Sequence, residues 1–233
     1  MSGILYGVGL GPGDAELMTL KAARLISGAK VVAYPALAGG SSFARSIAAA
    51  LIRDDVREIM ISVPMKVERG PAQAAYDAAA DEITAILETG LDVVVLCEGD
   101  PFFYGSFMYI YARIKPNFQT EIVPGITAMT ASAAALGLPL AARNEMLSVI
   151  PGPLSDAELR TKISAADSVA IMKVGRHLGR IRDVITDLGL LDQAHYIERA
   201  TLPEQQKKPL ANAPDPAPYF SMILITKEAD PWL

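Results

Sequence analysis

Short apolar runs alternate along the chain with longer segments of helical periodicity. The apolar runs predict buried strands at residues 4–8, 31–34, 59–63, 93–97, 121–123, 147–150, 168–173, 195–198 and 220–226. The longer segments predict a first helix that is capped by Asp14 and ends at about Ser27. They predict further helices at residues 42–52, 71–88, 107–114, 128–136, 155–165 and 178–188. Because strands alternate with helices, the pattern predicts an α/β fold whose sheet is mainly parallel.

A proline and a glycine interrupt this pattern in the middle of the chain. Val123-Pro124-Gly125 favours neither helix nor strand, so it predicts a hinge between an α/β lobe at residues 1–123 and a second one at 124–233. Pro35 is expected to end the second strand. Residues 203–218 contain five prolines and are expected to form a loop.

Composition excludes several classes of protein. About half of the 233 residues are hydrophobic, which is enough for a full core without disulfides. The net charge of −5 argues against a nucleic-acid-binding surface, which would be basic and clustered. Cys97 has no second cysteine to pair with, and His177 and His195 lack the neighbouring ligands of a metal site.

An uncharged run at residues 122–142 is long enough to span a bilayer. It is rich in small residues, and Pro124 and Pro139 stand near its ends, so a buried helix between two loops is the preferred interpretation. The first residues lack the basic region of a signal peptide. We therefore expect a cytoplasmic protein without a membrane partner.

The segment from Leu96 to Phe107 is the most informative part of the sequence. A predicted buried strand ends there in Glu98-Gly99-Asp100-Pro101, and three aromatic residues follow directly. Ligands of open α/β sheets bind at the carboxyl ends of the strands. Carboxylates, a turn and aromatics at such an end predict a site for a ligand with polar and flat apolar parts.

A second candidate loop, Gly9-Leu10-Gly11-Pro12-Gly13-Asp14, follows the first strand. A glycine-rich strand-to-helix turn can hold a phosphate group. Its spacing fits neither the dinucleotide-binding fingerprint nor a P-loop, and Pro12 removes one amide. A simple tight turn remains one interpretation, and a loop that lets a planar ligand approach the backbone is the better one.

Other residues have both a structural and a functional interpretation. Tyr104 is either the wall of a pocket or a group that moves a proton. Met172 is either a core residue or a thioether contact to a flat ligand. Lys173 and Arg176 are either a solvated helix start or a basic rim for an acidic substrate.

Four motifs in this order resemble those of the tetrapyrrole methylases. They are Gly9-Leu10-Gly11-Pro12-Gly13-Asp14, Glu98-Gly99-Asp100-Pro101, Val123-Pro124-Gly125-Ile126-Thr127-Ala128 and a late strand that contains Met172. The resemblance covers nearly the whole chain. It implies the two-lobed α/β fold of the class III S-adenosylmethionine-dependent methyltransferases, with the ligand cleft between the lobes, and S-adenosylhomocysteine as a product.

Within this family, the chain is most similar to the subgroup that methylates carbon 20 of precorrin-2 or of its cobalt form in cobalamin biosynthesis. The segments that carry this similarity are Tyr34-Pro35, Phe103-Tyr104, Gly137-Leu138-Pro139-Leu140 and Thr201-Leu202-Pro203-Glu204-Gln205. Uroporphyrinogen methylases usually have an acidic residue where this chain has Pro35. The family motif usually begins with glycine, and here Glu98 takes that place.

The resemblance also implies roles for individual residues. The implied contacts to S-adenosylmethionine are Pro12, Glu98, Gly99, Asp100, Phe103, Thr127, Ala128, Met172 and Ala200. Gly11, Tyr34, Arg143, Lys173 and Arg176 are the candidate contacts to the tetrapyrrole, and Tyr104 is the candidate catalytic residue. No metal ligand is expected, and the family implies a homodimer.

Three rival functions remain open from the sequence. A methylase of the same family could act on a different carbon or a later intermediate. A nucleotide-dependent oxidoreductase would need the glycine spacing that this chain lacks. A tetrapyrrole carrier without catalytic activity would not need a site for S-adenosylmethionine.

Overall fold

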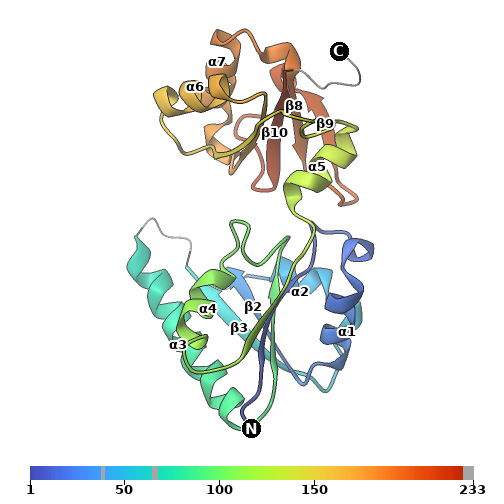
Figure 1. The fold of residues 1–233 in the computed structure, drawn as a ribbon, viewed down its shortest axis with the longest axis vertical. Helices are drawn as coiled ribbons and strands as arrows, with labels where there is room; N and C mark the ends of the chain where they lie inside the picture. Colours follow the sequence, from blue (N-terminus) through green and yellow to red (C-terminus); the bar gives the residue numbers. More distant parts are fainter. Residues whose placement is uncertain (38–39, 65–67, 228–233) are drawn as a thin grey trace. The chain divides into compact units, whose positions relative to one another are not determined.

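The chain folds into two compact units, Met1–Thr127 and Ala128–Leu233. A computed structural model describes residues 1–37, 40–64 and 68–227, and Figure 1 shows the succession of helices and strands. The unit boundary lies just after the Pro124-Gly125 hinge that the sequence predicts.

The first unit contains a five-stranded sheet in the order β3-β2-β4-β1-β5. The strands are β1 (Leu5–Gly9), β2 (Val31–Leu37), β3 (Arg57–Val63), β4 (Val93–Cys97) and β5 (Thr120–Val123). All neighbouring strands are parallel, as the pattern predicts. Their carboxyl ends therefore share one edge of the sheet, and β4, β1 and β5 are neighbours at that edge.

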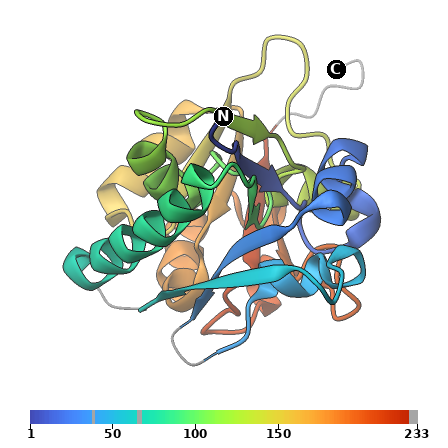
Figure 2. The same ribbon diagram turned by 90° about the horizontal axis from the view of Figure 1, so that it is seen from below.

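Helices cover both faces of this sheet. The helices are α1 (Leu20–Gly28), α2 (Phe43–Ile47), α3 (Arg69–Glu88) and α4 (Phe107–Ile114), with short 3₁₀ turns at Ala15–Leu17 and Ala49–Leu51. Figure 2 shows α3 and α4 on one side of the strands and α1 and α2 on the other. In β4, Val93, Val95 and Cys97 pack toward α3 and α4, whereas Val94 and Leu96 pack toward α1 and α2. This alternation explains why the strand is apolar at every position.

Two local predictions in this unit are wrong at their ends. The strand β2 continues through Pro35 to Leu37. The neighbour β4 pairs with β2 only at Val32 and Ala33, so Pro35 lies where β2 pairs with β3 alone, and a missing N–H is tolerated at such an edge. Asp14 caps only the 3₁₀ turn that begins at Ala15, and Thr19 caps α1 separately.

The second unit contains a sheet in the order β6-β7-β10-β8-β9. The elements of this unit are α5 (Ala128–Leu136), β6 (Leu147–Pro151), α6 (Asp156–Ala165), β7 (Ser168–Met172), a 3₁₀ turn (Gly175–His177), α7 (Leu178–Asp187), a 3₁₀ turn (Leu191–Gln193), β8 (Ala194–Glu198), β9 (Gln206–Pro209), a 3₁₀ turn (Leu210–Asn212) and β10 (Ser221–Thr226).

The expectation of a mainly parallel sheet is wrong for this second unit. Only β6 and β7 are parallel, whereas β7–β10, β10–β8 and β8–β9 are antiparallel pairs. The segments that join β8, β9 and β10 contain no α-helix, and antiparallel strands need no helical crossover. The predicted loop at 203–218 contains β9, which is an edge strand with exposed residues and no apolar run.

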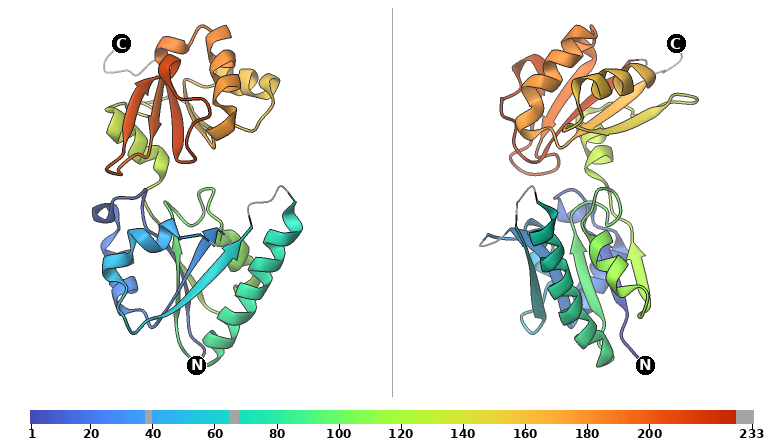
Figure 3. Two further views of the ribbon diagram at one scale, coloured as in Figure 1. Left: turned by 180° about the vertical axis from the view of Figure 1, so that it is seen from behind. Right: turned by 90° about the vertical axis from the view of Figure 1, so that its left-hand side faces the viewer.

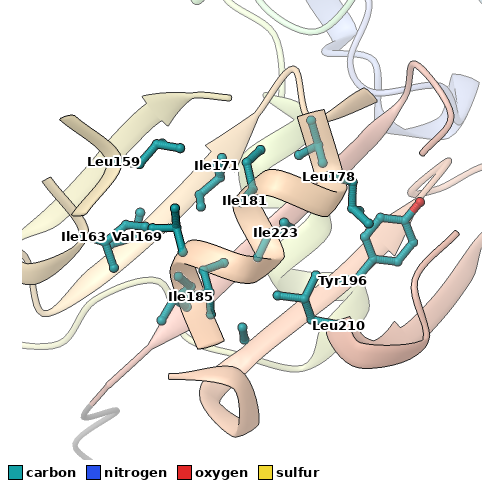
Figure 4. Close-up of a cluster of buried hydrophobic side chains, with 14 of the residues drawn as sticks. Leu159, Ile163, Val169, Ile171, Leu178, Ile181, Ile185, Tyr196, Leu210 and Ile223 are labelled. Carbon is teal, nitrogen blue, oxygen red and sulfur yellow. The ribbon is translucent and has the colours of Figure 1, made fainter. Parts of the chain in front are cut away.

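The two faces of the second sheet are also covered by helices. Figure 3 shows α6 and α7 against one face. Their apolar side chains, among them Leu159, Ile163, Ile181 and Ile185, pack on strand residues such as Ile171 (Figure 4). On the other face, Ala133 of α5 belongs to a smaller cluster that includes Leu224 of β10.

The apolar run at 122–142 is divided between the end of β5, the hinge, the nine-residue helix α5 and the irregular segment at 137–142. Among the helices that the structure describes, none is both long and apolar enough to cross a membrane.

Candidate functional site

Three loops meet at the carboxyl edge of the first sheet. They follow β1 (residues 10–14), β4 (residues 98–106) and β5 (residues 124–127), and we call them the first, second and third site loops. The Gly11 N–H donates to the Gly99 carbonyl at 3.2 Å, and the Gly99 N–H donates back to the Gly11 carbonyl at 2.8 Å. This pair of bonds joins the first two loops directly.

The Asp100 carboxylate joins the second loop to the third. Its Oδ1 accepts hydrogen bonds from the N–H groups of Phe102 at 2.9 Å and Phe103 at 3.1 Å. Its Oδ2 accepts from the Gly125 N–H at 3.0 Å. Backbone hydrogen bonds to an ionised acceptor are stronger than those between neutral groups.

Glycines allow the loop backbones to touch one another. A Cβ added to Gly9 would lie 2.6 Å from the Gly125 nitrogen and 2.7 Å from the Gly99 oxygen. A Cβ added to Gly125 would lie 2.0 Å from the Gly99 oxygen. No side chain fits in these gaps, so the glycine pattern of the sequence encodes contact between loops in addition to any approach of a ligand.

The aromatic residues of the second loop occupy different environments. Phe102 packs against Tyr111 and Phe107 of α4, with ring centroids 5.1 and 5.9 Å apart. Phe103 and Tyr104 contact each other edge to face at 5.3 Å, and Tyr104 is 43% exposed. Tyr104 therefore presents an aromatic surface and a hydroxyl at the loop, which suits both predicted roles.

Glu98 is the second carboxylate of this loop, and it is partly buried. It continues the alternation of β4 toward the side of α2. Burial raises the pKa of the Glu98 carboxyl, and the Ala44 backbone N–H at the start of α2 opposes that rise. Keeping Glu98 ionised therefore costs free energy in the folded protein.

The remaining predicted residues of the first unit lie near this edge. Pro12 is partly buried in the first loop, beside Asp14, whose Oδ1 accepts from the Glu16 N–H. Thr127 is partly buried at the end of the third loop, and Ala128, which begins the second unit, is exposed. The structure thus brings Gly11, Gly99 and Phe103 together with the loop that ends in Thr127, and Pro12 directly follows Gly11.

Tyr34 of β2 takes part in a polar cluster with Glu58 of β3 and Arg45 of α2, which sequence reasoning missed. Its hydroxyl donates to Glu58 Oε2 at 2.7 Å, and Arg45 binds both oxygens of Glu58 at 2.9 and 3.1 Å. Burial and the bond to Glu58 raise the pKa of the Tyr34 hydroxyl, and Arg45 and then Tyr34 lower the pKa of Glu58. Arg45 and Glu58 are far from Tyr34 in sequence and belong to no motif, so no sequence signal identifies the cluster.

The predicted residues of the second unit lie at ends of its strands and in loops. Met172 ends β7 and is partly buried, and Lys173 and Arg176 follow on exposed positions. Ala200 follows β8 and is partly buried, and Arg143 is exposed in the segment before β6. That these residues contact the cofactor or the substrate stays a prediction.

Left-handed backbone conformations occur at several of the predicted site residues. Among the described residues, the non-glycine residues with positive φ are Tyr104, Arg143, Lys173, Arg199 and Thr201, with φ between 44° and 71°. The first three are predicted site residues, and the last two flank Ala200. Such conformations cost free energy and gather at functional sites, where the surrounding structure holds them. The Thr201 N–H, for example, donates to the Gln205 side chain at 2.8 Å.

We predict that Gly9→Ala destabilises the protein by about 1–3 kcal/mol, because its methyl group would overlap the backbones of the second and third loops. Gly28→Ala is the matched control, since a Cβ at Gly28 meets nothing within 4 Å. That change should be neutral or slightly stabilising. Urea denaturation measures both, and equal effects would contradict the close packing of the loops.

We also predict that Glu98→Gln raises the free energy of unfolding at neutral pH. A carboxyl whose pKa is raised in the folded state binds more protons there than in the unfolded state, so its contribution to stability falls as pH rises above the ordinary value of 4.5. The difference in the free energy of unfolding between Glu98→Gln and the parent protein should therefore shrink toward acidic pH. Urea denaturation at several pH values tests this, with exposed Glu88→Gln as the control for lost charge, and a pH-independent difference would refute it.

Among the described residues, no group of three or more His, Cys, Asp or Glu side chains could hold a metal ion. Residues 4–213 match the family model of the tetrapyrrole (corrin/porphyrin) methylases. A precorrin-2 C(20)-methyltransferase from Sinorhizobium sp. is 41% identical over 238 residues, which cover 97% of each chain. A cobalt-precorrin-2 C(20)-methyltransferase from Salmonella typhimurium is 33% identical over 98% of each chain.

Solved structures show the same fold at lower identity. A cobalt precorrin-4 methyltransferase has a TM-score of 0.73 at 20% identity and covers 98% of this chain and 96% of its own. A uroporphyrin-III C-methyltransferase from Thermus thermophilus, complexed with S-adenyl homocysteine, has a TM-score of 0.69 at 24% identity over 97% and 92% of the two chains. The matches in sequence and fold, together with the site loops, show that this chain belongs to the tetrapyrrole methylase family.

Proposed function

We propose that this protein transfers a methyl group from S-adenosylmethionine to carbon 20 of precorrin-2 and so forms precorrin-3A in cobalamin biosynthesis. The observation that carries this proposal is the 41% identity with the Sinorhizobium precorrin-2 C(20)-methyltransferase along nearly the full length of both chains. The cobalt-bound substrate is the second candidate, supported by the more distant Salmonella relative at 33% identity.

The site loops have the chemistry that this cofactor requires. S-adenosylmethionine combines a flat adenine, a polar ribose and a charged methionine end, and its sulfonium supplies an activated methyl group. The loop edge offers backbone groups beside glycines, the carboxylate of Glu98 and the aromatic pair Phe103 and Tyr104. We assign the cofactor contacts to Pro12, Glu98, Gly99, Phe103, Thr127, Ala128, Met172 and Ala200, as the family motifs imply.

The reaction places modest chemical demands on the protein. A bond forms between carbon 20 and the methyl group, the methyl–sulfur bond breaks, and a proton leaves carbon 20. The reduced tetrapyrrole is already electron-rich, so the chain mainly aligns the reactants and excludes water, which can contribute about 7–11 kcal/mol. A rigid edge made of interlocked backbones suits this task.

Charged residues are assigned to the acidic side chains of the tetrapyrrole. Arg143, Lys173 and Arg176 are exposed cations in the second unit and can form charge-assisted bonds with carboxylates. Gly11 and Tyr34 complete the proposed substrate contacts. The hydroxyl of Tyr34 already donates to Glu58, so its ring is the part that we assign to the substrate.

We also propose that the protein is a homodimer, as the family resemblance implies, and that it is cytoplasmic. Light scattering should then give twice the chain mass of 24.8 kDa. A mass equal to that of one chain at micromolar concentration would refute the dimer.

We predict that the purified protein binds S-adenosylhomocysteine and methylates metal-free precorrin-2 with a higher kcat/KM than the cobalt form. Calorimetry measures the binding, and product mass with a ¹³C-labelled methyl group in NMR locates the new bond at carbon 20. Binding of a nicotinamide cofactor instead would favour an oxidoreductase. Binding of the tetrapyrrole without S-adenosylhomocysteine would favour a carrier, and a label at another carbon would favour a different methylase.

We predict that Tyr104→Phe lowers kcat by about 100-fold with little change in ligand affinity, if the hydroxyl moves the proton that leaves carbon 20. Tyr109→Phe is the control, because Tyr109 is also exposed but lies on α4 and stacks on Tyr76. Single-turnover kinetics and calorimetry separate the two effects. Full activity of Tyr104→Phe would leave Tyr104 as a wall of the site.

A further inference from the structure

We propose that Asp100 is a positioning residue that holds the second and third site loops together, and that it does not bind the cofactor itself. This inference rests on the proposed function for the identity of the ligand. It differs from the role that the family motif implies, in which Asp100 is one of the direct cofactor contacts. The geometry of its carboxylate supports the new assignment.

The hydrogen-bonding capacity of the carboxylate is largely occupied by the protein backbone. An ionised carboxylate offers about four acceptor positions on its two oxygens. Oδ1 receives the N–H groups of Phe102 and Phe103, and Oδ2 receives that of Gly125. Three of the four positions are therefore taken by backbone groups at 2.9–3.1 Å.

These bonds fix the parts of the loops that carry other site residues. The two bonds of Oδ1 close the turn that leads into Phe103 and Tyr104. Gly99 and Tyr104 on either side of this turn have φ of 64° and 57°, and the conformation of Tyr104 needs support from its surroundings. The bond of Oδ2 fixes Gly125, two residues before Thr127.

Only a carboxylate can make both sets of bonds. In asparagine, the carbonyl oxygen could replace Oδ1, but the amide NH₂ would then face the Gly125 N–H, donor against donor. Asp100→Asn keeps the size and shape of the side chain, so it specifically removes the link between the two loops. It is therefore the sharpest test of the proposal.

The first test is hydrogen exchange of the Gly125 amide, measured by NMR in the full chain without ligand. We expect Asp100→Asn to speed this exchange at least tenfold and to leave the Leu10 amide, which donates to the Cys97 carbonyl at 2.9 Å, unchanged. Asp92→Asn is the matched control, because Asp92 accepts the Ile4 N–H at 2.8 Å elsewhere in the same unit. Unchanged exchange at Gly125 would overturn the proposal.

A measurement on the unaltered protein covers the case in which the variant does not fold. The bond should give a scalar coupling between the Gly125 nitrogen and the Asp100 carboxyl carbon across the hydrogen bond. The Ile4–Asp92 bond, at a similar length, is the internal reference. A coupling for Ile4 without one for Gly125 would refute the link.

The second test separates positioning from direct contact with the ligand. S-adenosylhomocysteine and its 2′-deoxy and 3′-deoxy analogues are compared by calorimetry with the parent protein and with Asp100→Asn. A positioning residue should weaken all three ligands by the same factor, within about twofold. If Asp100 bound a ribose hydroxyl, the variant would lose much less affinity for the analogue without that hydroxyl, and the proposal would fail. Failure of the parent protein to bind any of the three would refute the proposed cofactor and leave the result at Gly125 standing.

Discussion

The candidate site depends on direct contact between the backbones of three loops at one edge of a parallel sheet. Strands β4, β1 and β5 are neighbours, so their loops emerge side by side. Gly9 and Gly125 let these loops touch, because a Cβ at either position would overlap the backbone of another loop. Parallel pairing creates the edge, glycine permits the contact, and hydrogen bonds hold it. A ligand at this edge meets a surface whose shape is set before binding, so little of the binding free energy is lost in ordering it.

Much of the fold could be predicted from the sequence, because burial dictates it. The strand β4 is apolar at every position since both of its faces are covered, and its bounds match the prediction. The failures occur where burial gives no signal. The strand β9 has a polar, exposed sequence at the edge of its sheet, so only its pairing with β8 reveals it. The antiparallel order of the second sheet likewise depends on which strands become neighbours, and no local pattern records this.

The site could be predicted in part for a similar reason. Short motifs identified the loops after β1, β4 and β5, and the structure joins them through Gly11, Gly99 and Gly125. The sequence could not show that Asp100 receives the Gly125 N–H, because that bond connects residues 25 positions apart. The same limit applies to Glu58, which binds Tyr34 across 24 positions. Motifs record which residues a site needs, whereas the fold decides which of them bind one another.

The two acids of the second loop differ because of the direction in which each leaves the backbone. Glu98 continues the alternation of β4 and faces the start of α2, where the Ala44 N–H is near its carboxylate and burial raises its pKa. Asp100 lies beyond the strand, where the turn directs its carboxylate back to the amides of its own loop and of Gly125. An acid whose acceptor positions are occupied by backbone N–H groups has a structural role. An acid that is costly to keep ionised gains most from a cationic neighbour, since a nearby positive charge offsets its desolvation. We therefore propose Glu98 rather than Asp100 for direct contact with the positively charged methyl donor, whereas the carboxylate of Asp100 holds its own loop to Gly125.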